Sequence, residues 1–239
     1  MDRFFLFLFW SNLIFGTTVF FFQRGFLLSR EVLSDRTQCP NQKITNETCY
    51  QMPRQYSKAI VLLIDALRYD FAVYDKNISA SNLKPYQNAM PIISKLIEQG
   101  HGKLYQSFAD PPTTTMQRLK GLTTGSIPTF IDISANFASY EIHEDNIIDQ
   151  LINRGRKVVF AGDDTWMSLF PNRFTRSYPF PSFDVWDLDT VDRGVEENLE
   201  KELKNPENWD VLIGHFLGKF KKISKILGNF KNIGKFKKF

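Results

Sequence analysis

The stretch Ala59-Ile-Val-Leu-Leu-Ile-Asp65 decides the fold class of this chain. Six consecutive apolar residues predict a strand that is covered on both faces, as in a parallel sheet. The strand ends at Asp65, and a carboxylate leaving a buried strand needs a partner, because an unpaired buried charge is costly. A bound metal is one such partner. Alternatively, Asp65 caps the next turn or pairs with Arg68.

The region that follows alternates between strand patterns and helix patterns. Further strands are predicted at residues 103–108, 157–161 and 210–217. Helices are predicted in the second half of 81–99, before Gly100, and at 115–122, 146–153 and 191–203. Such alternation predicts an α/β domain with a mainly parallel sheet.

Polar residues mark the predicted strand ends, where the chemistry of open α/β sheets gathers. Besides Asp65, these ends offer Asp110, the pair 163–164 and His215. The two aspartates at 163–164 are candidates for metal binding or for a solvated turn, and we favour structural roles for both and for Trp166. Three histidines in 239 residues give little support to a histidine-rich metal site or a catalytic triad.

Three threonines, Thr113, Thr114 and Thr115, stand at the start of a predicted helix. Free backbone N–H groups and the helix dipole favour an anionic group such as phosphate there. A threonine hydroxyl at this place could attack phosphorus if a metal lowered its pKa. The local alternative is a threonine that caps the helix after a proline turn.

An uncharged stretch of 19 residues, Phe4–Phe22, lies near the N-terminus. As a helix it is long enough to cross a hydrocarbon core of about 30 Å. A cleaved signal peptide usually has an apolar region of about 7–15 residues and a small-residue cleavage site. This stretch ends in three phenylalanines, so we predict an uncleaved membrane anchor.

The polar region 25–57 reads as a membrane-proximal connector, and it contains the only two cysteines, Cys39 and Cys49, which could close a short disulfide loop. Glycosylation sequons begin at Asn46 and Asn77. Together these features predict that the body of the protein lies in the secretory lumen.

The basic charge of the chain belongs to its last 21 residues. Residues 219–239 hold eight lysines and no acidic residue, so residues 1–218 carry a net charge of −4 although the whole chain carries +4. No nucleic-acid partner is expected. The tail is either a basic amphipathic segment for an anionic membrane surface or, as we favour, translated intron or frameshifted A/T-rich DNA.

Four blocks of sequence resemble a known family. They are Leu-Leu-Ile-Asp-Ala-Leu-Arg-Tyr-Asp at 62–70, the block at 109–132 that includes Pro-Pro-Thr-Thr-Thr-Met-Gln-Arg-Leu-Lys-Gly-Leu, Gly-Asp-Asp-Thr-Trp at 162–166, and 180–192. The chain resembles the N-terminal part of the class O, or third, group of GPI ethanolamine phosphate transferases, within the alkaline phosphatase superfamily. The resemblance runs to about Gly218.

The resemblance implies an alkaline-phosphatase-like luminal domain, followed by many membrane spans, in the endoplasmic reticulum. It implies transfer of phosphoethanolamine from phosphatidylethanolamine to the third mannose of the GPI precursor lipid. A small membrane partner subunit is a further expectation. By the same resemblance, Asp65 is the first metal ligand and Thr115 is both nucleophile and metal ligand, with Thr114 as the fallback. Two zinc ions would stabilise the displacement at phosphorus.

The chain departs from the family after Gly218. The family continues with Val-Asp-His-Cys-Gly-His and, much later, with Ser-Asp-His-Gly, which supply further zinc ligands, and this chain has neither. We therefore expect an anchor at 1–24, a connector at 25–57, a partial domain at 58–218 and an aberrant tail at 219–239. As written, the chain is expected to be an inactive fragment of the transferase.

Two other readings stay open at this point. The chain could be a non-catalytic, membrane-anchored luminal protein derived from the transferase. It could also be a soluble secreted phosphodiesterase of the same superfamily, which would require signal cleavage near Gly25 and a chain that resumes with metal ligands.

Overall fold

The computed structural model describes residues 2–26, 35–37, 56–109, 111, 113–127, 141–181, 187 and 189–218. Several sequence-based predictions lie outside these residues. They are the disulfide between Cys39 and Cys49, the sequon at Asn46, Asp110, most of the connector, and the tail at 219–239.

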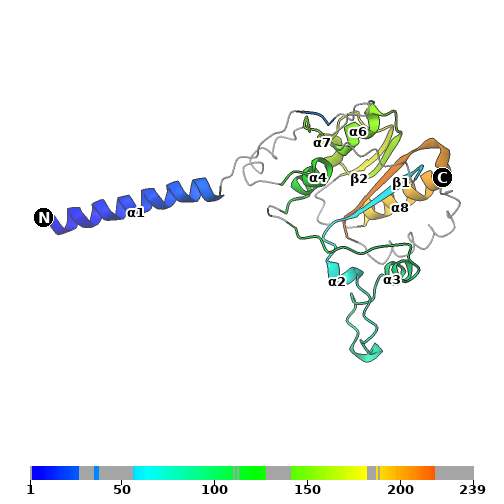
Figure 1. Cartoon of the computed structure of the whole chain (residues 1–239), viewed down its shortest axis with the longest axis horizontal. Helices are drawn as coiled ribbons and strands as arrows, with labels where there is room; N and C mark the ends of the chain where they lie inside the picture. The colour runs from blue at the N-terminus through cyan, green and yellow to red at the C-terminus, as the bar shows by residue number, and fades with distance from the viewer. Residues whose placement is uncertain are drawn as a thin grey trace, which may run out of the picture.

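A four-stranded parallel sheet forms the centre of the body (Figure 1). Its strands are β1 (Ala59–Ile64), β2 (Val158–Asp163), β3 (Arg176–Phe180) and β4 (Val211–Phe216), in the order β1-β4-β2-β3. Every pairing is parallel. The α/β class with a mainly parallel sheet is therefore confirmed.

Helices cover both faces of the sheet. Helix α8 (Thr190–Leu203) packs on one face, and α4 (Thr115–Thr124), α6 (Ile147–Asn153) and α7 (Thr165–Leu169) lie on the other (Figure 1). Each face of the sheet has its own hydrophobic core. Alternate residues of β2 belong to one core or the other, because successive side chains of a strand point to opposite faces. Val159 and Ala161 join the core under α8, and Val158 and Phe160 join the other.

The two inner strands are buried throughout, but β1 is not. It lies at an edge of the sheet, and Val61 is 41% exposed. The prediction that 59–64 is covered on both faces is therefore wrong for part of one face, where Ala59 and Val61 are exposed while Leu63 packs against the second core. Ile60, Leu62 and Ile64 still pack against the α8 core, which explains the apolar run.

Two short helical segments and α3 (Pro91–Glu98) follow β1; the segments are α2 (Tyr69–Ala72) and a 3₁₀ turn at Ala80–Asn82. The chain leaves α3 through Gly100, whose φ of 71° suits glycine, so the predicted helix and its stop are confirmed. The strand predicted at 103–108 is wrong. This segment is irregular and pairs with none of the described strands.

The sequence patterns missed β3 and α7. Strand β3 contains Pro179, which argues against a central strand but is tolerated in an edge strand. Helix α7 has only five residues, too few to show a helical period. A second 3₁₀ turn, Pro206–Asn208, leads into β4.

Helix α1 (Asp2–Phe26) stands apart from the body (Figure 1). Residues Arg3–Gly25 are long and apolar enough to cross a membrane, and none of the tested window is buried in the protein. The hydroxyl groups of Thr17 and Thr18 donate to carbonyl oxygens one turn back, so they are satisfied without water. These features suit the predicted anchor.

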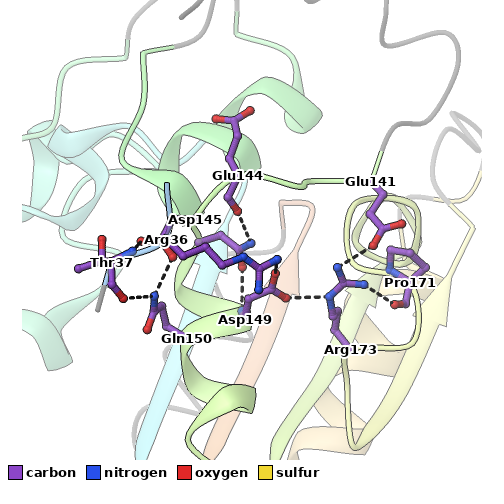
Figure 2. A network of polar contacts seen from close by, with 10 residues as sticks. Arg36, Thr37, Glu141, Glu144, Asp145, Asp149, Gln150, Pro171 and Arg173 are labelled. Atoms are coloured by element: carbon purple, nitrogen blue, oxygen red, sulfur yellow. Dashed lines mark hydrogen bonds and ion pairs between the residues drawn. The ribbon is translucent and has the colours of Figure 1, made fainter. Parts of the chain in front are cut away.

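The short described part of the connector, residues 35–37, binds to the start of α6 (Figure 2). The Thr37 N–H donates to Asp145 Oδ2 at 3.0 Å, and Gln150 Nε2 donates to both the Thr37 carbonyl and Asp145 Oδ1. Hydrogen bonds from Thr37 and then Gln150 lower the pKa of Asp145 to about 2. The connector is thus joined to the body through hydrogen bonds to the ionised carboxylate of Asp145.

A cluster of ion pairs around Arg173 and Asp149 lies beside this contact. Arg173 donates to Asp149 at 2.7 Å and pairs with Glu141 at 2.6 Å, and Arg36 approaches Asp149 from the connector at 3.7 Å (Figure 2). Hydrogen bonding to Asp149 is the main reason that the pKa of Arg173 is raised.

Candidate active site

Asp65 sits directly beyond the end of β1. Its backbone N–H donates to the Phe216 carbonyl of β4 at 2.8 Å, so the residue is still held by the sheet. Its Oδ1 accepts the Ala66 N–H at 2.8 Å, and Ala66 has a left-handed φ of 55° that turns the chain away. The other carboxylate oxygen, Oδ2, is left to face α4.

Thr115 meets that oxygen. Thr115 is the first residue of α4, and its Oγ1 donates to Asp65 Oδ2 at 3.0 Å. The two residues are 50 positions apart in sequence. The fold thus brings together the two residues that the family resemblance singled out as nucleophile and first metal ligand.

Of the local alternatives for these residues, Asp65 does accept a backbone N–H of the next turn, but neither its pairing with Arg68 nor a threonine cap on α4 is seen among the described residues. Thr114 stands at the N-cap position of α4, but its side chain makes no capping hydrogen bond and is exposed. Arg68 pairs with Asp70, at 3.0 and 2.7 Å. Of the three threonines, Thr115 is the one that donates to Asp65.

His215 lies on β4 beside this pair and is only 2% exposed. Its Nδ1 accepts a hydrogen bond from Trp166 Nε1 at 3.2 Å, which leaves the proton of the neutral ring on Nε2. Burial lowers the pKa of His215, and the nearby carboxylates of Asp163, Asp65 and Asp192 oppose that shift only in part. A neutral imidazole is therefore favoured.

Asp163 and Trp166 have the structural roles that we favoured. Asp163 Oδ1 accepts the Thr165 N–H at 2.7 Å at the start of α7. Trp166 is 2% exposed and packs against Phe160 and Phe170 in the core.

A cleft of about 620 Å³ opens between the end of β1 and α4. This volume falls in the usual range of ligand sites. Its polar lining consists of Asp65, Ser107, Thr113, Thr115, Gln117, Arg118, Ser126 and His215. Phe108 and Leu122 also line it and are 82% and 63% exposed. The cleft is thus lined both by polar and charged side chains and by exposed apolar ones.

Gln117 and Arg118 were missed by the sequence reasoning as site residues. The sequence does show a polar residue at 117, inside the predicted helix and two positions after Thr115. Polar residues in helices are usually exposed to solvent, so this one did not stand out. Only the burial of position 117 separates it from that ordinary case.

The described residues do not form a zinc site. Among them, no group of three His, Cys, Asp or Glu side chains is placed to hold a metal ion. Asp65 and Thr115 supply one carboxylate and one hydroxyl, whereas a catalytic zinc takes three protein ligands. The two zinc ions that the resemblance implies therefore do not fit this part of the chain.

The sequon at Asn77 lies in an exposed turn. The Asn77 N–H donates to Asp75 Oδ1 at 2.8 Å, and the Asn77 and Ser79 side chains are both exposed. The site is sterically open to modification, and its occupancy stays a prediction.

Comparison with known proteins points to one kind of enzyme. Over 231 residues the chain is 45% identical to the human protein named GPI ethanolamine phosphate transferase 3, catalytic subunit, covering 89% of this chain and 21% of the relative. It is 47% identical over 205 residues to GPI ethanolamine phosphate transferase 3 of Saccharomyces cerevisiae, covering 84% of this chain and 20% of the relative. The chain is similar to GPI ethanolamine phosphate transferase 3. The resemblance inferred from the motifs is therefore confirmed.

The similarity extends to a second group at lower identity. The chain is 40% identical over 166 residues to human GPI ethanolamine phosphate transferase 2, covering 70% of this chain and 16% of the relative. It spans about one fifth of the length of the GPI ethanolamine phosphate transferase 3 relatives. No family model and no solved structure matches.

Proposed function

We propose that the cleft around Asp65 and Thr115 is the phosphoryl-transfer site of a phosphoethanolamine transferase of GPI-anchor biosynthesis. The donor is phosphatidylethanolamine, and the acceptor is the third mannose of the GPI precursor lipid. The names of the relatives support transfer of ethanolamine phosphate to GPI, and the donor lipid and the acceptor sugar are taken from the family resemblance. The observation that carries the proposal is the 3.0 Å hydrogen bond from Thr115 Oγ1 to Asp65 Oδ2 at the N-terminus of a helix.

In the first step, Thr115 Oγ1 attacks the phosphorus of the donor lipid while its proton passes to Asp65. The bond from phosphorus to the diacylglycerol oxygen breaks, and that oxygen takes the proton from Asp65, which returns to its carboxylate form. Phosphoethanolamine is then held on Thr115. The free backbone N–H groups in the first turn of α4 favour the negative charge of the phosphoryl oxygens.

In the second step, the 6-hydroxyl of the mannose attacks the same phosphorus and gives its proton to Asp65. The bond from phosphorus to Thr115 Oγ1 breaks, and the threonine oxygen takes that proton from Asp65, which lies within hydrogen-bond distance. Neither step is routed through zinc, because the described residues supply too few ligands for it. Because the family resemblance makes the reaction depend on zinc, and the described residues supply too few ligands to hold it, we expect no turnover by the 239-residue chain alone.

The proposed location is the membrane of the endoplasmic reticulum, with the body in the lumen. Helix α1 supports a membrane anchor, and the sequon at Asn77 supports the luminal side. The human relative is named a catalytic subunit, which supports a further proposal of a partner subunit; that this subunit is a small membrane protein is taken from the family resemblance.

The experiment compares Thr115→Ala, Thr115→Ser and Thr114→Ala in the protein made from the natural transcript. Membranes are supplied with phosphatidylethanolamine labelled in its headgroup and with a trimannosyl GPI acceptor. We expect Thr115→Ala to abolish both transfer and covalent labelling of the protein, Thr115→Ser to keep part of each, and Thr114→Ala to keep both. Loss in Thr114→Ala with full activity in Thr115→Ala would assign the nucleophile to Thr114.

A non-catalytic role is the second candidate, favoured by the lack of a metal-ligand group among the described residues. If the role is non-catalytic, the protein made from the natural transcript would bind the phosphoethanolamine headgroup but would not become covalently labelled.

A further inference from the structure

Gln117 carries a buried amide without a partner. The residue is 0% exposed, and neither its Oε1 nor its Nε2 has a hydrogen-bond partner among the residues that the structure describes. It lines the cleft that contains Asp65 and Thr115. Buried amides are almost always paired, because an unpaired one costs the fold stability. An unpaired buried amide beside a candidate active site therefore points to a ligand that pairs with it.

Arg118 presents a second unpaired group in the same cleft. Its Nη2 is buried and has no hydrogen-bond partner in the described part of the chain. Arg118 lies three residues after Thr115 on α4, and residues with this spacing share one face of a helix. A guanidinium beside the helix N-terminus and the threonine hydroxyl forms a site for phosphate oxygens.

We propose that Arg118 and Gln117 bind the phosphoethanolamine headgroup and that Gln117 selects ethanolamine over choline. The inference rests on the proposed transfer reaction. Arg118 Nη2 and Gln117 Nε2 donate to phosphate oxygens, and Gln117 Oε1 accepts an N–H of the ammonium. Glutamine suits this task because its amide offers both donors and an acceptor.

The discrimination follows from what choline lacks. A quaternary ammonium has no N–H, so choline would leave Gln117 Oε1 buried and unpaired. Sites built to hydrogen-bond a substrate group reject analogues that lack it. The complete burial of Gln117 also favours a small headgroup over the bulky glycan as its partner.

Stability provides the first test, using the 239-residue chain in maltoside micelles. Gln117→Met keeps the side-chain length and removes both unpaired polar atoms. We expect its melting temperature to rise by about 3 °C or more. Gln99→Met, at an exposed position just after α3, is the matched control and should change it little. A lower melting temperature for Gln117→Met would make Gln117 structural and overturn the proposal.

Binding provides the second test, by calorimetry with O-phosphoethanolamine, O-phosphocholine and inorganic phosphate. We expect the wild-type chain to prefer phosphoethanolamine over phosphocholine by about tenfold or more, and Gln117→Met to lose that preference. Nanodiscs of phosphatidylethanolamine or phosphatidylcholine then show whether the same preference holds for the intact lipid. Equal binding of all three soluble probes, or no binding, would overturn the headgroup assignment.

Thr115→Ala separates this inference from the proposed reaction. We expect this variant to keep the ethanolamine preference, because neither Gln117 nor Arg118 is changed. A preserved preference without covalent labelling of the protein made from the natural transcript would refute the threonine mechanism alone. Labelling without a preference would refute the role of Gln117 alone.

Discussion

Gly194 lies inside α8 against the ring of Phe180, and this contact gives a sharp prediction of stability. A Cβ at position 194 would lie 2.2 Å from Phe180 Cζ and 2.3 Å from its Cε1. Carbon atoms in contact sit about 3.5–4.0 Å apart, so the ring or the helix must move by more than about 1 Å. Gly194→Ala therefore overpacks the core between β3 and α8.

Two opposing effects set the size of the change. Alanine is favoured over glycine in a helix interior by about 1 kcal/mol. Overpacking costs about 1–3 kcal/mol, and the 2.2 Å approach places this site at the upper end. We expect a net loss of about 1–2 kcal/mol, or a fall in melting temperature of about 2–8 °C.

The assay is thermal and urea unfolding, followed by tryptophan fluorescence. Trp166 and Trp209 are fully buried and report on the two cores. Phe180→Leu shortens the obstructing side chain and serves as the matched background. There, Gly194→Ala should be neutral or stabilising. An equal loss in both backgrounds, or a gain in the wild type, would refute the steric reasoning.

The remaining predictions concern charged groups. Glu202 accepts hydrogen bonds from Arg176 at 3.1 and 2.7 Å, and Arg176 is the main cause of its lowered pKa. Glu202→Gln should cost about 1.5–3 kcal/mol at pH 7 in urea unfolding, and the difference should shrink as the pH falls below the ordinary carboxyl pKa of 4.5. Burial lowers the pKa of His215, so the unfolded chain binds the extra proton first, and stability should fall as the pH drops below 6.5. In His215→Asn that fall should be weaker in melts between pH 7.5 and 5.5. Asp145→Asn should weaken the connector contact and speed hydrogen exchange of the Thr37 amide. Micromolar zinc should leave the melting temperature of the 239-residue chain unchanged.

Each of these expectations has a contrary outcome. A constant Glu202→Gln difference down to pH 3 would mean that the carboxylate charge is not what stabilises the contact. An equal slope with pH in His215→Asn would assign the titration to another group, and His101→Asn, at an exposed position, is the control. Unchanged exchange at Thr37 would mean that the contact with Asp145 is not formed in solution. A large thermal shift with zinc would reveal ligands outside the described residues.

The sequence by itself determined the elements whose patterns are local. The apolar runs at β1, β2 and β4 and the periodicity of α3, α6 and α8 were recognisable, because each pattern repeats within a single element. The length of the apolar helix near the N-terminus predicted the anchor in the same way. Asp65 and Thr115 were chosen by a motif resemblance, which carries positional information that composition lacks.

The tertiary structure decided what depends on neighbours distant in sequence. The meeting of Asp65 with Thr115, 50 residues apart, requires the sheet to place β1 beside the start of α4. Residues 103–108 have a strand-like pattern but no partner among the described strands, and a strand is stabilised only by pairing. Gln117 reads as an ordinary polar helix residue until its burial is known. Glycine is a poor helix former, and its presence at position 194 is explained only by the ring of Phe180 packed against it. A sequence pattern cannot show this, because packing depends on two surfaces and the pattern describes one.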